Sequence, residues 1–168
     1  MGACCDSSGS DMRPAPSGGI VKHAGGPSGQ TIKVEYFDLG FGRADPIVQL
    51  LKHKGVAFEY VQVSQESWGT RKAAGDAGEM GGLPIVHIGG QSRQQTNAIL
   101  RSFGIQHGYY NPTDWKSAGI ADVIIDSYTD TFGAIAKVLF MQGDEEKAAE
   151  LESVKNGILT KFLTIVEK

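Results

Sequence analysis

Cysteine is nearly absent from this 168-residue chain: Cys4 and Cys5 are the only two, and they are adjacent near the N-terminus. This arrangement excludes a disulfide framework and a C-x-x-C redox pair, and it leaves no thiol nucleophile in the rest of the chain. The histidines at positions 23, 53, 87 and 107 lack the helical spacing that places two metal ligands on one face. The sequence therefore predicts no metal site.

The chain also has no large excess of positive or negative charge and no long apolar run. The 16 basic and 19 acidic residues give a formal charge of −3, so the chain has no basic footprint for nucleic acid, and we expect no nucleic-acid partner. No apolar run approaches the length of a membrane span, and the N-terminus has no apolar core of a secretory signal. The expected compartment is the cytoplasm.

Residues 1–30 are rich in glycine, serine and proline and show no apolar periodicity, so we expect a disordered tail. Within it, Gly2 followed by Cys4 and Cys5 is typical of myristoyl and palmitoyl attachment, although the motif prefers Ser or Thr where Asp6 stands. Two acyl chains would anchor the protein stably to a membrane, whereas one chain binds only marginally. An unmodified tail and a lipid-anchored peripheral form both remain open.

From residue 31 the pattern changes to alternating strands and helices. The segment "TIKVEYF" predicts a strand, "RADPIVQLLKHKG" a helix ending at Gly55, and "VAFEYVQV" a second strand. A polar stretch over 64–82, irregular or helical, precedes a hairpin turning on Gly89 and Gly90 and a short helix ending at Gly104. The order β-α-β-(irregular or α)-β-β-α indicates a compact α/β sandwich with a mixed sheet.

Beyond residue 113 the chain reads as two amphipathic helices. Apolar residues recur at three- and four-residue steps, which predicts one buried stripe on each helix. The first stripe consists of Ile120, Ile124, Tyr128, Phe132, Ile135 and Leu139, and the second of Leu151, Val154, Ile158, Phe162 and Ile165.

The run Gly40-Phe41-Gly42 lies between a strand and a helix, as in a dinucleotide-binding loop. That motif needs a third small residue, but Asp45 stands at this position and would repel a pyrophosphate. The following strands also do not continue as βαβ units, so we disfavour a nucleotide.

Three segments in order, "YFDLGFGRADPIVQLL", "LPIV" and "QTNAILRSFG", resemble the glutathione transferases of the tyrosine type, in their sigma- and mu-like branch. The resemblance runs from about Lys33 to Lys168 and implies an α+β fold. A thioredoxin-like glutathione-binding domain (βαβαββα) would span 31–108, and an incomplete all-helical domain 113–168. The family's helical domain is longer, so we expect a C-terminally short member.

The resemblance implies that glutathione is the co-substrate and that its thiolate is conjugated to apolar electrophiles in detoxification. Tyr36 would hydrogen-bond the sulfur, which favours the thiolate and lowers the thiol pKa, and Arg43 would add positive charge nearby. An ordinary tyrosine at a strand end is the alternative interpretation of Tyr36. The loop after Tyr36 is one residue longer than the family pattern, at Gly40-Phe41.

The resemblance also implies a glutathione-binding set. Leu83, before an expected cis Pro84, would pair with the peptide backbone, and Gln95 and Thr96 at a helix start would bind the γ-glutamyl carboxylate. Trp68 and Lys72 would contact the glycine carboxylate. For Trp68, burial as a packing residue is an almost equal interpretation. A lysine or glutamine common in the family is replaced by a glycine at position 82.

Asp122, Asp126 and Asp130 recur every four residues on the first long helix, where like charges destabilise and a nearby cation would help. We expect Asp122 to lie on a solvated face. By resemblance, Asp130 reaches the glutathione of a neighbouring subunit, which implies a homodimer; a divalent-cation site is a second interpretation of these carboxylates. Two alternative functions remain open: a non-catalytic interaction module of the same fold, and a glutathione-dependent isomerase of the prostaglandin-synthase type.

Overall fold

A five-stranded mixed sheet forms the first part of the molecule, whose computed structural model describes residues 19–23, 31–39 and 41–168. The strands are β1 Ile20–His23, β2 Ile32–Phe37, β3 Phe58–Val63, β4 Ile85–Ile88 and β5 Gln91–Arg93, in the order β1-β3-β2-β4-β5. β2 is parallel to β3 and antiparallel to β4, while β1 and β5 pair antiparallel with β3 and β4.

Strand β1 corrects the prediction of one disordered tail over residues 1–30. It pairs along β3 with Ile20 opposite Val61, so the backbone groups on the side that faces β3 are hydrogen-bonded in the sheet. Four residues between glycine-rich segments are too few to show a periodicity, so this strand could not be predicted from the sequence. The rest of the predicted tail, including Gly2, Cys4 and Cys5, lies outside the described residues.

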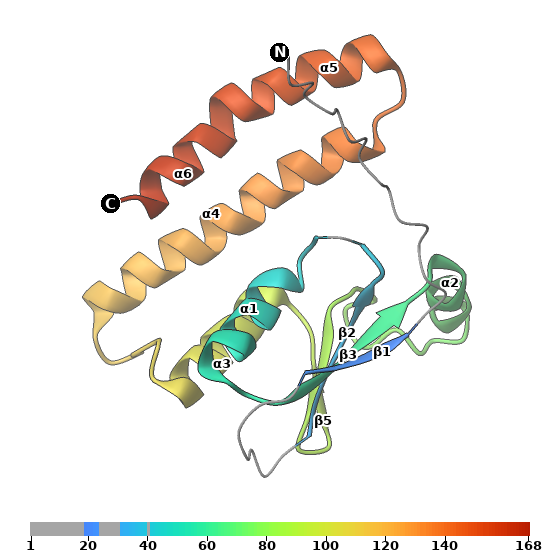
Figure 1. Cartoon of the computed structure of the whole chain (residues 1–168), viewed down its shortest axis with the longest axis vertical. Coiled ribbons are helices and arrows are strands. Elements are labelled where there is room, and N and C mark those ends of the chain that lie inside the picture. Colours follow the sequence, from blue (N-terminus) through green and yellow to red (C-terminus); the bar gives the residue numbers. More distant parts are fainter. Residues whose placement is uncertain (1–18, 24–30, 40) are drawn as a thin grey trace, which may run out of the picture.

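Two helices, α1 (Asp45–Lys54) and α3 (Thr96–His107), cover one face of the sheet, and α2 (Gln65–Ala73) lies at its other side (Figure 1). Side chains alternate along a strand, so every second residue of β2 points towards α1 and α3. The core between them is made by buried aliphatic and aromatic residues of both layers: Ile32, Val34, Ile47, Leu51, Val86, Ile99 and Phe103.

Local signals account for the bounds of α1 and α2. Pro46 lies in the first turn of α1, and Gly55 ends this helix in the left-handed region at φ 70°. The stretch predicted as irregular or helical forms α2, because the Ser64 hydroxyl accepts a hydrogen bond from the Ser67 amide at 3.1 Å and caps the helix.

Helix α3 does not end at Gly104, as the sequence predicted, but continues to His107 and is capped by Gly108 at φ 79°. Gly104 serves a close approach instead: a Cβ there would lie 2.8 Å from Cβ of Tyr110, which folds back over the helix. The Gly104 carbonyl accepts hydrogen bonds from the Tyr109 and Tyr110 amides. A glycine of this kind has the same signature in sequence as a helix end.

The C-terminal part is a helical hairpin. Helix α4 (Trp115–Phe140) is followed by α5 (Asp144–Val154), a π-helical turn η1 (Lys155–Leu159) and α6 (Thr160–Val166), which together lie alongside α4 (Figure 1). The stripe predicted for α4 is only partly covered, since Ile120 is 67% exposed and Leu139 47%. None of the helices in the described part is long and apolar enough to cross a membrane.

The predicted fold class, a thioredoxin-like α/β unit followed by an all-helical part, is thus confirmed. The domain limits 31–108 and 113–168 stay a prediction.

Candidate functional site

Tyr36 stands near the end of β2, one residue before the loop that leads to α1. Its side chain belongs to the main core and is only 5% exposed. The hydroxyl oxygen accepts a hydrogen bond of 2.9 Å from the backbone N–H of Arg43. Because this bond occupies the acceptor side of the oxygen, the O–H proton of Tyr36 remains available for a second partner.

The loop between β2 and α1 is held by side chains from three elements. Asp45 of α1 accepts from the Gly42 amide at 2.6 Å, and Tyr128 of α4 donates to the Gly42 carbonyl at 3.0 Å. Thr96 of α3 donates to the Arg43 carbonyl at 3.0 Å. With the Arg43 amide on Tyr36, all four backbone polar groups of Gly42 and Arg43 are satisfied by side chains.

Gly42 is required by close packing rather than by its dihedral angles. A Cβ at this position would lie 2.3 Å from Cε1 and 2.6 Å from the hydroxyl oxygen of Tyr36. The glycine loop thus brings the backbone against the tyrosine ring. This contact gives the second glycine of the apparent dinucleotide motif a purpose that requires no phosphate.

Burial raises the pKa of Tyr36 above its ordinary value of 10, although the Arg43 amide and the Arg43 charge act in the opposite direction. The hydroxyl is therefore protonated at neutral pH and can act as a hydrogen-bond donor. Arg43 itself is exposed, and its guanidinium lies over the ring of Phe132 at 5.6 Å.

Five of the residues predicted from the sequence line one cavity of ≈ 250 Å³. Gln95 has a φ of 71°, the one positive value among the non-glycine residues that the structure describes, and such sparsely populated conformations cluster at binding sites. The Leu83–Pro84 peptide bond is cis, as expected. The five predicted residues are Arg43, Leu83, Pro84, Gln95 and Thr96, and Met80, Gly82 and Gln94 complete the wall.

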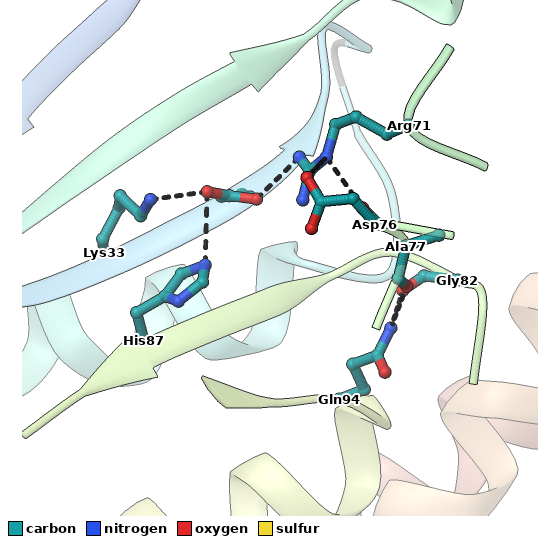
Figure 2. A network of polar contacts seen from close by, with 8 residues as sticks. Lys33, Arg71, Asp76, Ala77, Gly82, His87 and Gln94 are labelled. Carbon is teal, nitrogen blue, oxygen red and sulfur yellow. Dashed lines mark hydrogen bonds and ion pairs between the residues drawn. The ribbon is translucent and has the colours of Figure 1, made fainter. Parts of the chain in front are cut away.

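Gln94 is a wall residue that the sequence reasoning missed. Its amide nitrogen donates to the carbonyls of Ala77, at 3.0 Å, and of Gly82, at 2.6 Å (Figure 2). Its amide oxygen accepts from the Met80 N–H at 3.0 Å. One side chain thereby holds the glycine-rich segment 77–82 directly before Leu83. We name this set of three hydrogen bonds the Gln94 clamp. Glutamines at positions 94 and 95 look equivalent in sequence, so no signal separated their roles.

A second polar network ties the sheet to α2. Glu35 is 6% exposed, and its carboxylate lies 2.6 Å from Lys33 Nζ, 2.9 Å from Arg71 Nη1 and 3.2 Å from His87 Nε2 (Figure 2). Burial raises the pKa of Glu35, but the hydrogen bonds from Lys33 and Arg71, together with the charges of Lys33 and His87, outweigh it and bring the pKa below its ordinary value. Glu35 therefore carries a buried negative charge.

Trp68 and Lys72 are not in the wall of the ≈ 250 Å³ cavity that contains Leu83, Pro84 and Gln95. Trp68 is 5% exposed in a small core with Val63, Ala77 and Ile85, where its ring meets Phe37 edge-on, as in the packing interpretation of this residue. Lys72 is exposed and its Nζ lies 5.8 Å from the centroid of the Trp68 ring.

The aspartate stripe of α4 meets a cation, as its charge density required. Arg101 of α3 lies 2.6 Å from Asp122 and 3.4 Å from Asp126. The Asp122 side chain is partly exposed and is also paired: its carboxylate accepts from the Tyr110 hydroxyl at 3.1 Å, and the hydrogen bond from Arg101 lowers its pKa. Asp130 is exposed further along the helix, beside Lys161 and Phe162 of α6.

A larger and apolar cavity, of ≈ 420 Å³, lies between the start of α1 and the helical hairpin. Phe41 of the loop meets Phe132 of α4 edge-on, with ring centroids 6.2 Å apart. The exposed surface of the wall is mostly apolar. The other lining residues are Asp45, Pro46, Gln49, Tyr128, Thr131, Ile135, Leu159 and Phe162. Within the described ranges no group of three or more histidine, cysteine or acidic side chains could hold a metal ion.

Comparison with known proteins points to one family. The chain is 32% identical over 143 residues to glutathione S-transferase 1 of Ascaris suum, covering 81% of this chain and 65% of that protein. It is 26% identical to a glutathione S-transferase of Anopheles gambiae, over 79% of this chain and 63% of that protein. The prostaglandin synthase D of Nilaparvata lugens is similar in structure, with a TM-score of 0.67, 25% identity, and coverage of 80% of this chain and 65% of the other.

No family model matches the chain. The chain spans less than two thirds of the length of these two curated relatives.

Proposed function

We propose that the chain belongs to the glutathione S-transferase family, and that it binds glutathione and transfers its thiolate to apolar electrophiles. The observation that carries the proposal is the Tyr36 hydroxyl, whose acceptor side is filled by the Arg43 amide and whose proton is free for a sulfur. Arg43 also lines the cavity that contains Leu83, Pro84, Gln95 and Thr96.

The proposed chemistry begins with loss of the thiol proton to solvent. A free thiol titrates near about 8.5, so a donor that stabilises the thiolate increases the reactive fraction at neutral pH. The Tyr36 O–H donates to the sulfur, and the Arg43 guanidinium adds a positive charge. The thiolate electron pair then forms a C–S bond at the electrophilic carbon, and the leaving group departs with the electrons of the bond that breaks.

We assign the γ-glutamyl end and the central peptide of glutathione to the same cavity, and the glycine end to Lys72, outside its wall. The γ-glutamyl carboxylate would lie at the start of α3, a 12-residue helix whose N-terminal dipole suits an anion, next to Gln95 and Thr96. The Thr96 hydroxyl already donates to the Arg43 carbonyl, so the backbone amides are the better donors there. The backbone of Leu83 would pair with the peptide, and exposed Lys72 beside Trp68 would meet the glycine carboxylate.

The apolar cavity supports an apolar co-substrate. It lies beside the loop that carries Arg43, and Phe41 and Phe132 in its wall are rings on which a flat electrophile could stack. Retention on immobilised glutathione together with conjugation of a chromogenic electrophile tests the proposal. Retention without turnover would favour the non-catalytic interaction module, and absence of both would reject glutathione as a ligand.

We propose a homodimer in which Asp130 reaches the glutathione of the neighbouring subunit. Its exposed carboxylate on α4 is available for such a contact. Sedimentation equilibrium should give the mass of two chains, and Asp130→Asn should raise the KM for glutathione without dissociating the dimer. A monomer with full glutathione affinity would reject this assignment.

We propose the cytoplasm as the compartment, with a membrane-bound fraction created by acylation of Gly2, Cys4 and Cys5. Labelling with alkyne analogues of myristate and palmitate in cells tests it. Gly2→Ala should abolish myristoyl incorporation and release the protein from membranes. If Gly2→Ala and wild type fractionate equally between membrane and cytosol, the result would indicate that the tail is unmodified.

A second candidate activity is glutathione-dependent isomerisation of the prostaglandin-synthase type, favoured by the similarity to the Nilaparvata lugens structure. The same bound thiolate would serve it. Product analysis with a prostaglandin endoperoxide, in the presence and absence of glutathione, separates it from conjugation.

A further inference from the structure

We propose that Tyr128 is a positioning residue, through which the helical part holds the Tyr36–Arg43 loop in its working geometry; this inference rests on the proposed glutathione chemistry. The hydroxyl of Tyr128 donates to the Gly42 carbonyl at 3.0 Å, across 86 residues of chain. In the part of the chain that the structure describes, this is the one hydrogen bond from the loop to the helical part.

The bond acts on the peptide unit between Gly42 and Arg43. Its carbonyl accepts hydrogen bonds from the Tyr128 hydroxyl and from the Asp45 N–H, each at 3.0 Å, and its N–H is the donor to the Tyr36 hydroxyl. A peptide unit is planar, so a rotation that moves the carbonyl also moves the N–H. Anchoring the carbonyl therefore fixes the direction from which the amide reaches Tyr36, and with it the direction of the Tyr36 proton.

The Tyr128 side chain is held firmly by aromatic packing. Its ring stacks on Phe132 with centroids 6.2 Å apart, and Phe162 of α6 lies at 6.3 Å on a tilted plane. Burial, followed by the charge of Asp45, raises its pKa to about 12, so the hydroxyl keeps its proton at all physiological pH values. Phe132 in turn lies under the Arg43 guanidinium and against Phe41. The helical hairpin thus fixes both the backbone and the side chains of the loop.

The experiment compares two single-hydroxyl deletions in the full chain. Tyr128→Phe removes the bond to Gly42. The matched control Tyr110→Phe removes a hydroxyl that also makes a hydrogen bond involving α4, from the segment between α3 and α4 to Asp122, but not to the loop. Amide hydrogen exchange, measured by NMR, reports on the loop in the ligand-free protein. Loss of one hydrogen bond should speed the exchange of the Gly42 and Arg43 amides about fivefold in Tyr128→Phe alone.

With glutathione bound, Tyr128→Phe should raise the pKa of the thiol and lower kcat at pH values below that pKa. The KM for glutathione should stay within about twofold, since the cavity walls are intact. Tyr110→Phe should reproduce the wild-type thiol pKa. Unchanged loop exchange in Tyr128→Phe, or equal acceleration in both variants, would overturn the inference. Failure of the proposed function is seen separately, as absence of glutathione binding by the wild-type protein.

Discussion

The backbone amide of Arg43 donates a 2.9 Å hydrogen bond to the hydroxyl oxygen of Tyr36. The bond joins the two residues that the sequence placed at the reacting sulfur, and it orients the tyrosine before any ligand arrives. A donor aimed in advance at a developing charge needs little reorganisation during the reaction.

The first prediction concerns the tyrosine. Tyr36→Phe should lower the conjugation rate about 100-fold, because one charge-stabilising donor is lost, while retention on immobilised glutathione persists. The pKa of bound glutathione, followed by thiolate absorbance, should rise towards the value of the free thiol. Full activity of the variant would remove Tyr36 from the site.

The second prediction concerns the glycine under the ring. In Gly42→Ala the new Cβ would meet Tyr36 Cε1 at 2.3 Å, so the ring must move and conjugation should fall about tenfold or more. The control is Gly119→Ala in α4, where nothing lies within 4 Å.

Replacing that exposed helical glycine should stabilise the fold by about 0.5 kcal/mol in chemical denaturation and leave conjugation unchanged. Equal activity of the two alanine variants would contradict the close packing of the loop.

The third prediction concerns the Gln94 clamp, which holds segment 77–82 beside the cavity. Gln94→Ala leaves two carbonyls and one amide without this partner, and the affinity for glutathione should fall about tenfold by calorimetry. The thiol pKa of the residual complex should not change, because none of the three hydrogen bonds of the clamp goes to the loop between Tyr36 and Arg43. A shifted thiol pKa with normal affinity would show that the two regions had been assigned the wrong way round.

The fourth prediction concerns pH. The pKa of Glu35 in the folded chain is below its ordinary value of 4.5, so its carboxylate stabilises the fold above that pH. The contribution is lost as pH falls through the folded pKa. Urea denaturation of wild type should show this decline in acid.

Glu35→Gln should lower the free energy of unfolding by about 2 kcal/mol at pH 7, since Lys33 and Arg71 lose a buried partner, and should flatten the acid decline. Glu59→Gln is the control, because its pair with Lys22 is largely exposed and should matter by less than about 0.5 kcal/mol. A Glu35→Gln profile parallel to wild type would contradict the network.

Sequence reasoning reached the parts of the fold and site that depend on neighbouring residues. Alternation gave β2, Pro46 and Gly55 gave the bounds of α1, and the ordered family segments led to the cis Pro84 and to the residues around one cavity. The first of these are local signals. The last is the spacing of family segments, which implies the family's fold.

Relations between distant residues were out of reach. The contact of Tyr128 with Gly42 depends on how the helical hairpin lies against the loop, which no periodicity encodes. The helix end was misplaced at Gly104 because a glycine needed for close approach looks like a glycine that ends a helix. The partner of Asp122, Arg101, was not predicted because it comes from another element.

The central claim is that a glutathione thiol is held as thiolate beside Tyr36. Its most direct test is a titration of the full chain with reduced glutathione by calorimetry, coupled to a pH titration of the bound thiol by ultraviolet absorbance. The account predicts saturable binding and a bound thiol with a pKa clearly below the value of about 8.5 for a free thiol. Absence of binding at millimolar glutathione, or a bound thiol that titrates like the free one, would contradict it.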